Sequence, residues 1–307
     1  MLLWIGNRNK INMAHSHDIK YNKAFAIGIA LNVIYIVVEF VYGLISNSMA
    51  LIADAGHNLS DVLGLILAWV AAYLAAKTPT EKRTYGFRKS TVLASLTNAV
   101  ILLIAVGAIT VEAVNRFFEP QVIESNTIII VAAIGVIING ITAMLFFSGH
   151  KHDLNIKGAF LHMAADAAVS LGVVVGAVII GLTNLYWIDP VLSLIIVAVI
   201  TIGTWGLLKE SLNLSLDAVP SEIELEKVKK YLSSLPGVEN VHHLHIWAMS
   251  TTETALTVHL YKPHASYEDE FMEKVNKELY DKFGIGHATI QIEKSEDCND
   301  NRSHNKI

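Results

Sequence analysis

The first two thirds of the chain alternate between long apolar stretches and short polar segments, a pattern that predicts membrane-spanning helices. Each apolar stretch has about 20 residues or more, enough to cross a ~30 Å hydrocarbon core at about 1.5 Å per residue. Backbone groups in lipid must be satisfied within the segment, so helices are expected rather than the strands of a barrel. Six stretches fit this pattern, at residues 24–45, 49–76, 91–114, 127–147, 158–182 and 187–208.

The polar segments between the stretches carry their basic residues on one side. Eleven lysines and arginines lie in the N-terminal tail and in the loops after the second and fourth stretches, whereas only Arg116 lies on the opposite side. By the positive-inside rule, this asymmetry predicts that both termini are cytosolic. The tail, residues 1–23, has no signal-peptide pattern. The short loops favour a multi-pass protein of a bacterial inner (plasma) membrane.

From about residue 211 the periodicity changes to that of a soluble domain. A helical run at 222–235 ends at Pro236 and Gly237, and two alternating stretches at 241–247 and 255–261 follow. A second helix and a last strand complete an αββαβ order, which predicts a small sheet with helices on one face and resembles a metallochaperone-like domain. The predicted organisation is a tail at 1–23, a six-helix transmembrane domain at 24–210, an α+β cytosolic domain at 211–295 and a flexible tail at 296–307.

Composition and charge support this division. The chain is 53% apolar and only 17% charged, which argues against an ordinary soluble enzyme, a disordered chain or a nucleic-acid-binding protein. Residues 1–210 hold 25 charged residues, and the much shorter segment 211–307 holds 26. The single cysteine, Cys298, excludes an intrachain disulfide and fits a reduced, cytosolic C-terminal domain.

Ionisable side chains inside the apolar stretches are the candidate functional residues, because a charge at bilayer depth is costly. The second stretch contains His57 and Asp61, and the fifth contains His162 and Asp166. Residues four apart lie on one helix face, about 6 Å apart along the axis. Two imidazoles and two carboxylates form a four-ligand set that suits tetrahedral Zn²⁺. The alternative for either pair alone is a hydrogen bond to a neighbouring helix or a water.

Other buried acids leave two interpretations open. Asp54 shares the helix face of His57 and Asp61, where it is either a further ligand or proton relay, or a helix-packing or outer-vestibule residue. Glu39 is expected to line a cavity or to hydrogen-bond a polar neighbour, and Glu112 is expected near the outer surface.

Several motifs resemble those of the cation diffusion facilitator family of divalent-metal transporters, nearest to bacterial zinc exporters. They span nearly the whole chain in the family's order: HNLSD (57–61), TYGFRK (84–89), GAFLHMAAD (158–166), LDAVP (216–220), HHLHIW (242–247) and HATIQIE (287–293).

The resemblance implies a homodimer that exports Zn²⁺ in exchange for protons by alternating access. The family's transport site corresponds here to His57, Asp61, His162 and Asp166, and histidine at the first position favours Zn²⁺ over Cd²⁺. The family's charge interlock at the domain junction corresponds to Lys89 and Asp217, for which a solvated pair of little energetic value is the alternative. No histidine lies in the loop between the second and third stretches, so the additional loop site of some relatives is expected to be absent.

The soluble domain holds the candidates for a second metal site. Period 2 places His287 and Glu293 on one face of the last strand and gives His259 a polar face on the middle strand, so His259 and His287 are predicted to meet. His242 has the parity of the apolar Ile246 and fits less well. The resemblance implies cytosolic zinc ligands at or near these three histidines, and an exposed, solvated sheet surface is the alternative.

Competing functions are a passive metal channel and a membrane-embedded metalloenzyme. Tight tetrahedral coordination slows release, which argues against a channel. Four protein ligands leave no open coordination position, which argues against an enzyme. The predicted partners are therefore divalent metal ions, protons, the lipid bilayer and a second copy of the chain. The chain is expected to bind neither an organic cofactor nor nucleic acid.

Overall fold

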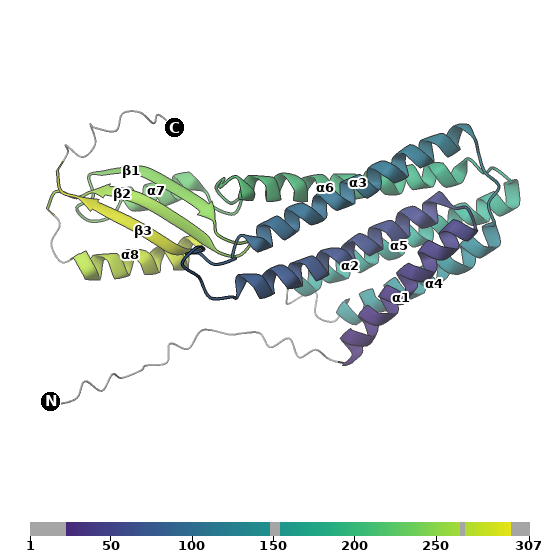
Figure 1. Ribbon diagram of the computed structural model, residues 1–307, viewed down its shortest axis with the longest axis horizontal. Coiled ribbons are helices and arrows are strands. Elements are labelled where there is room, and N and C mark those ends of the chain that lie inside the picture. The colour runs from purple at the N-terminus through teal and green to yellow at the C-terminus, as the bar shows by residue number, and fades with distance from the viewer. Residues whose placement is uncertain (1–22, 148–153, 265–267, 296–307) are drawn as a thin grey trace.

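The computed structural model describes residues 23–147, 154–264 and 268–295, which form a long helical bundle joined end-on to a small sheet domain (Figure 1). The bundle consists of α1 (Lys23–Ile45), α2 (Met49–Ala75), α3 (Ser90–Phe118), α4 (Ser125–Phe147), α5 (Leu154–Thr183) and α6 (Ile188–Ser215). The C-terminal domain consists of α7 (Leu225–Ser233), β1 (Asn240–Ala248), β2 (Thr254–Tyr261), α8 (Glu268–Phe283) and β3 (Ile285–Glu293).

The bundle has the surface of a membrane protein. Large apolar side chains such as Trp69, Ile104 and Leu182 are more than 60% exposed, as expected where lipid replaces water. Within the described residues, α2 to α6 are long and apolar enough to span a bilayer. In α1, the apolar helix Val33–Ile45 is shorter than a span. The predicted helical membrane domain followed by a small α+β domain is confirmed, and the sixth span stays a prediction.

The helices extend beyond several of the predicted spans. α5 begins at Leu154, four residues before the predicted start, which places His162 about 6 Å deeper in its helix. α6 continues to Ser215, beyond the predicted end at residue 208, because charged Lys209 and Glu210 are compatible with a helix that leaves the membrane.

The bundle is held by close helix pairs, with α3 packed along α6 and α4 along α5, while α2 contacts α1, α3, α5 and α6. At the α1–α4 contact, a Cβ on Gly135 would clash with Tyr35 Oη. Tyr35 is itself only 3% exposed, so a side chain at position 135 displaces a packed aromatic ring. This close approach explains a glycine inside α4.

Gly135→Ala is therefore expected to destabilise the bundle by about 1–3 kcal/mol, the usual cost of overpacking. Gly140→Ala is the matched control, because a Cβ on this α4 glycine meets nothing within 4 Å. The thermal unfolding midpoints of the two purified variants would be compared with that of the wild type. Equal midpoints for both variants would contradict the packing argument.

The C-terminal domain has the predicted αββαβ order. Its three strands lie in the order β1-β2-β3, with β1 antiparallel and β3 parallel to β2. The connection between the parallel strands contains α8, as a parallel pair requires. Both helices pack into one apolar cluster with the sheet, through Val228 and Leu232 of α7 and Val275 and Leu279 of α8.

A bulge in β1 changes the side-chain alternation. His242 pairs with His259 but His245 pairs with Thr257, so one extra residue is inserted in β1 between these positions. His243 takes up the irregularity with a positive φ of 50°. As a result, Val241 and Ile246 are both buried although their parity differs.

Candidate metal centre

The two histidine–aspartate pairs of α2 and α5 meet inside the bundle. Asp61, His162 and Asp166 each offer a ligand atom within 4.8 Å of the others. His57 Nε2 lies 3.6 Å from Asp166 Oδ1 and 3.8 Å from Asp61 Oδ2. His162 Nε2 lies 3.2 Å from Asp61 Oδ2 and 3.7 Å from Asp166 Oδ2. The structure therefore brings together all four predicted transport-site residues, each imidazole facing both carboxylates.

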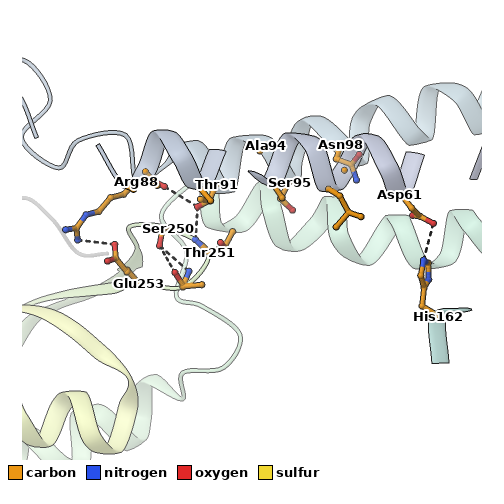
Figure 2. A pocket seen from close by; sticks show the side chains of 17 residues that line it. Asp61, Arg88, Thr91, Ala94, Ser95, Asn98, His162, Ser250, Thr251 and Glu253 are labelled. Carbon is orange, nitrogen blue, oxygen red and sulfur yellow. Dashed lines mark hydrogen bonds and ion pairs between the residues drawn. The ribbon is translucent and has the colours of Figure 1, made fainter. Parts of the chain in front are cut away.

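A cavity leads to this four-residue cluster from the side of the C-terminal domain. It has a volume of about 860 Å³ and is lined by Asp61 and His162 at one end and by Ser250 to Glu253 at the other. Figure 2 shows the cavity residues Thr91, Ser95 and Asn98 of α3 between the β1–β2 turn at one end and the Asp61–His162 contact at the other. The side chain of Asp166 is only 3% exposed and that of His162 is 44% exposed. The cluster thus has one accessible edge and one buried edge.

The donor set suits a divalent metal of borderline hardness. Two imidazole nitrogens and two carboxylates provide four ligands and a formal charge of about −2, which neutralises a bound divalent ion. Asp54 lies outside this set, because His57 and His162 pair with Asp61 and Asp166 and not with Asp54, whose Oδ2 accepts a hydrogen bond from Ser170 Oγ at 2.8 Å. Glu39 accepts a hydrogen bond from Tyr35 Oη at 2.7 Å, in agreement with the predicted polar neighbour. Glu112 pairs with Arg116 at 2.8 Å.

A second cluster lies on the sheet of the C-terminal domain. His242, His259 and Glu293 offer ligand atoms within 4.8 Å of one another. Glu293 contacts His242 Nε2 at 3.1 Å and His259 Nδ1 at 2.8 Å, and its side chain is only 6% exposed. Local desolvation and the neighbouring imidazoles of His259, His242 and His245 hold the pKa of His243 below its usual value. The lowered pKa favours the neutral form of His243, which lies beside the cluster.

The prediction that His259 and His287 meet is wrong. The cluster contains Glu293 in place of His287. β2 and β3 are parallel with His259 opposite Gln291, which places His287 opposite Ala255, four residues away along the strand. His287 instead packs its ring against Tyr85, with centroids 5.8 Å apart. Glu293 lies beside His259 instead. The sequence pattern had placed Glu293 on this face of β3 but had not indicated it as a ligand.

The structure also places the predicted charge interlock, Lys89 and Asp217, at the domain junction. Lys89 Nζ donates to Asp217 Oδ1 at 2.5 Å and to the carbonyl oxygens of Leu214 and Ala248, each at 2.9 Å. A second ion pair, Arg88 with Glu253 at 3.0 Å, lies beside it. All three ammonium hydrogens therefore have acceptors, two of which the sequence did not reveal.

Several predictions fall outside the described residues. They are the N-terminal tail, the basic loop after the fourth apolar stretch at residues 148–153, and the tail after residue 295 with Cys298.

Two protein-family models match the two parts of the chain. The cation efflux transmembrane domain matches residues 25–214, and the cation efflux protein cytoplasmic domain matches residues 220–295. The chain is 37% identical to the cation efflux system protein CzcD of Alcaligenes sp. over 281 residues, covering 91% of this chain and 89% of that one. It is 32% identical to the zinc transporter ZitB of Pectobacterium atrosepticum, covering 92% and 89%.

A third relative is the cadmium, cobalt and zinc/H(+)-K(+) antiporter of Bacillus subtilis, 30% identical with 94% of each chain covered. A solved structure, the metal-bound C-terminal domain of the CzcD transporter from Cupriavidus metallidurans, is 40% identical and covers 23% of this chain and 99% of its own, with a TM-score of 0.22. These relatives are cation transporters and not enzymes. The chain belongs to the cation efflux family, through both its transmembrane and its cytoplasmic domain.

Proposed function

We propose that the protein exports Zn²⁺ from the cytosol in exchange for protons, through a tetrahedral site formed by His57, Asp61, His162 and Asp166. The observation that carries the proposal is the convergence of these four side chains at the deep end of the cavity that begins at the cytoplasmic domain. The names of similar proteins support the substrate, since they include zinc transporters and an antiporter that takes cadmium, cobalt and zinc.

Competition between metal and protons provides the coupling. A ligand histidine must be neutral and a ligand aspartate ionised, so protons and Zn²⁺ exclude each other at the same atoms. Because an ordinary imidazole titrates near neutral pH, such an exchange responds to a physiological proton gradient. The cavity gives the site access from the cytoplasmic-domain side in this conformation, and rocking of helix groups around the fixed site would open the other side.

The orientation follows from the same proposal. With the cytoplasmic domain in the cytosol, α2 enters from the outer surface at Met49 and α5 from the inner surface at Leu154. Six spans then place both termini in the cytosol of a bacterial inner membrane, with α1 as the first span. The cytoplasmic domains are expected to join two copies in a homodimer, and no organic cofactor is required.

The cluster on the sheet is proposed to bind Zn²⁺ through His242, His259 and Glu293, and so to bias the transport equilibrium. His259→Ala is expected to weaken zinc binding by the cytoplasmic domain by roughly 100-fold, since even partners of metal ligands contribute about 10–100-fold. His287→Ala is the matched control on the same sheet and should leave the affinity unchanged. Isothermal titration of the full-length variants with Zn²⁺ measures both values; equal losses would contradict the assignment.

Zinc flux in liposomes tests the transport function. Purified protein should move Zn²⁺ against an imposed proton gradient, and a protonophore should bring the flux down to the rate set by the zinc gradient alone. A passive channel gives a flux that is indifferent to the proton gradient, and this result would overturn the exchange mechanism. The measurement also includes Cd²⁺ and Co²⁺ as competitors, which defines the range of ions transported.

A further inference from the structure

A second pair of acidic side chains lies behind the four-residue cluster, on the side away from the cytoplasmic domain. Glu39 of α1 and Asp54 of α2 are both 0% exposed. Asp54 precedes His57 by three residues, and its partner Ser170 follows Asp166 by four. The pair therefore lies about one helical turn, ~5 Å, beyond the metal ligands on both α2 and α5.

The contacts of this pair account for three of its four oxygens. Glu39 accepts hydrogen bonds from Tyr35 Oη at 2.7 Å and from Asn58 Nδ2 at 3.3 Å. Asp54 Oδ2 accepts from Ser170 Oγ at 2.8 Å, whereas Asp54 Oδ1 is buried and has no donor. The donors Tyr35 Oη and Ser170 Oγ both lie next to Gly135, and Asn58 follows Asp54 by one turn of α2, so the two carboxyl groups are neighbours. Asp54 Oδ1 is therefore the one carboxyl oxygen of the pair that lacks a hydrogen-bond donor.

In the part of the chain that the structure describes, the two acids also lack a positively charged partner. Among the described residues, no lysine or arginine pairs with Glu39 or Asp54. Two adjacent carboxylates without a cation cannot both stay ionised away from water, and one shared proton removes the repulsion. The cavity that reaches Asp61 and His162 is not lined by either acid, and both acids are 0% exposed, so their surroundings suit a proton better than a hydrated metal ion.

We propose that Glu39 and Asp54 form a proton-binding dyad that holds one proton between their carboxyl groups and serves as the outer station of the transported proton. This inference deepens the proposed function, on which its transport role rests. No residue of the dyad is a metal ligand, so proton and Zn²⁺ occupy two neighbouring sites in addition to competing at one.

The neighbouring charges set the direction of coupling. The titratable groups nearest to the dyad are Tyr35, which donates to Glu39 from α1, and His57 and Asp166, which lie about one turn from Asp54 on α2 and from Ser170 on α5. When the four-residue cluster is empty, the charge of its aspartates favours a proton on the dyad. A bound Zn²⁺ neutralises that charge and favours release of the proton. By linkage, protonation of the dyad weakens zinc binding by the same factor, which for coupled sites is typically about 5- to 150-fold.

Infrared difference spectroscopy of the full-length protein tests the proton directly. Addition of Zn²⁺ at neutral pH should cause the loss of a protonated-carboxyl C=O band, and this band should shift in D₂O. Glu39→Gln and Asp54→Asn should each abolish the band, while Glu112→Gln, an exposed acid elsewhere in the bundle, should keep it. Persistence of the band in both dyad variants would overturn the proposal, as would its absence from the wild type.

Tyr35→Phe keeps both acids and serves where the dyad variants fail to fold. Loss of the Tyr35 hydroxyl weakens the hydrogen bonding of Glu39, so the band should move to higher frequency; an unshifted band would contradict the assignment. In liposomes, Glu39→Gln should retain zinc–zinc exchange. The factor by which a proton gradient accelerates its zinc uptake should be at least tenfold smaller than in the wild type. Unaltered acceleration would refute the transport role of the dyad, whereas failure of the wild type to transport zinc would refute the proposed function alone.

Discussion

Asparagine in place of Asp166 is expected to abolish gradient-driven zinc uptake and to weaken zinc binding in the membrane domain by roughly 100-fold or more. Groups that only orient metal ligands already contribute about 10–100-fold, and Asp166 faces both imidazoles directly, at 3.6 and 3.7 Å. Its side chain is 3% exposed, so no water is available to replace the lost carboxylate oxygen. The variant would also leave Zn²⁺ with an uncompensated positive charge in a low-dielectric site.

The two aspartates of the cluster differ in exposure, so their substitutions should differ in effect. The Asp61 side chain is 33% exposed and borders the cavity, so water can complete the coordination shell in Asp61→Asn. The loss of affinity should therefore be smaller for Asp61→Asn than for Asp166→Asn. Asp281→Asn, an exposed position on α8, is the control for the chemical change itself. Zinc binding and liposome uptake would be measured for all three, and wild-type uptake by Asp166→Asn would show that the transport site lies elsewhere.

The sequence predicted the convergence of the four side chains of α2 and α5 because the information for it is local. The apolar stretches define the helices, and the spacing from His57 to Asp61 and from His162 to Asp166 places each pair on one face of a single helix. An antiparallel approach of α2 and α5 is then enough to form the cluster. Only the start of the fifth helix was inaccurate, because the polar residues before Gly158 concealed the helical turn that begins at Leu154.

The sheet site was harder to predict because it depends on register. Alternation assigns Glu293 and His287 to the same face of β3 but does not say which of them lies beside His259; the pairing of β2 with β3 decides this. The bulge around His243 similarly puts His242 on the opposite face of β1 from the one that strict alternation predicts. The hydrophobic pattern does not indicate that one residue is inserted there.

The junction shows a related limit. A lysine and an aspartate far apart in sequence suggest an ion pair, but the backbone acceptors of Lys89 appear only in the folded chain. Through Asp217 and Leu214 the ammonium group holds the end of α6, and through Ala248 it holds the end of β1. Lys89 thus connects the start of α3 to the end of α6 and, across the domain boundary, to the end of β1.

Lys89→Met is accordingly expected to destabilise the junction by about 2 kcal/mol, the low end for several charge-assisted hydrogen bonds because the side chain is one third exposed. Zinc uptake should fall about tenfold, since the rocking helices lose their attachment to the cytoplasmic domain. Asp217→Asn removes only one acceptor's charge and should cost less in both respects. Thermal unfolding midpoints and liposome uptake measure the two effects.

The exchanged pair Lys89→Asp with Asp217→Lys separates an ion pair from a three-acceptor anchor. The exchange restores opposite charges at the junction, so a simple ion pair predicts nearly full recovery of stability and uptake. In the structure, however, position 89 must supply donors to two carbonyl oxygens, and an aspartate there adds a third acceptor beside them. We therefore expect the double variant to remain at least as impaired as Lys89→Met. Recovery to wild-type uptake would show that the charges alone hold the two domains together.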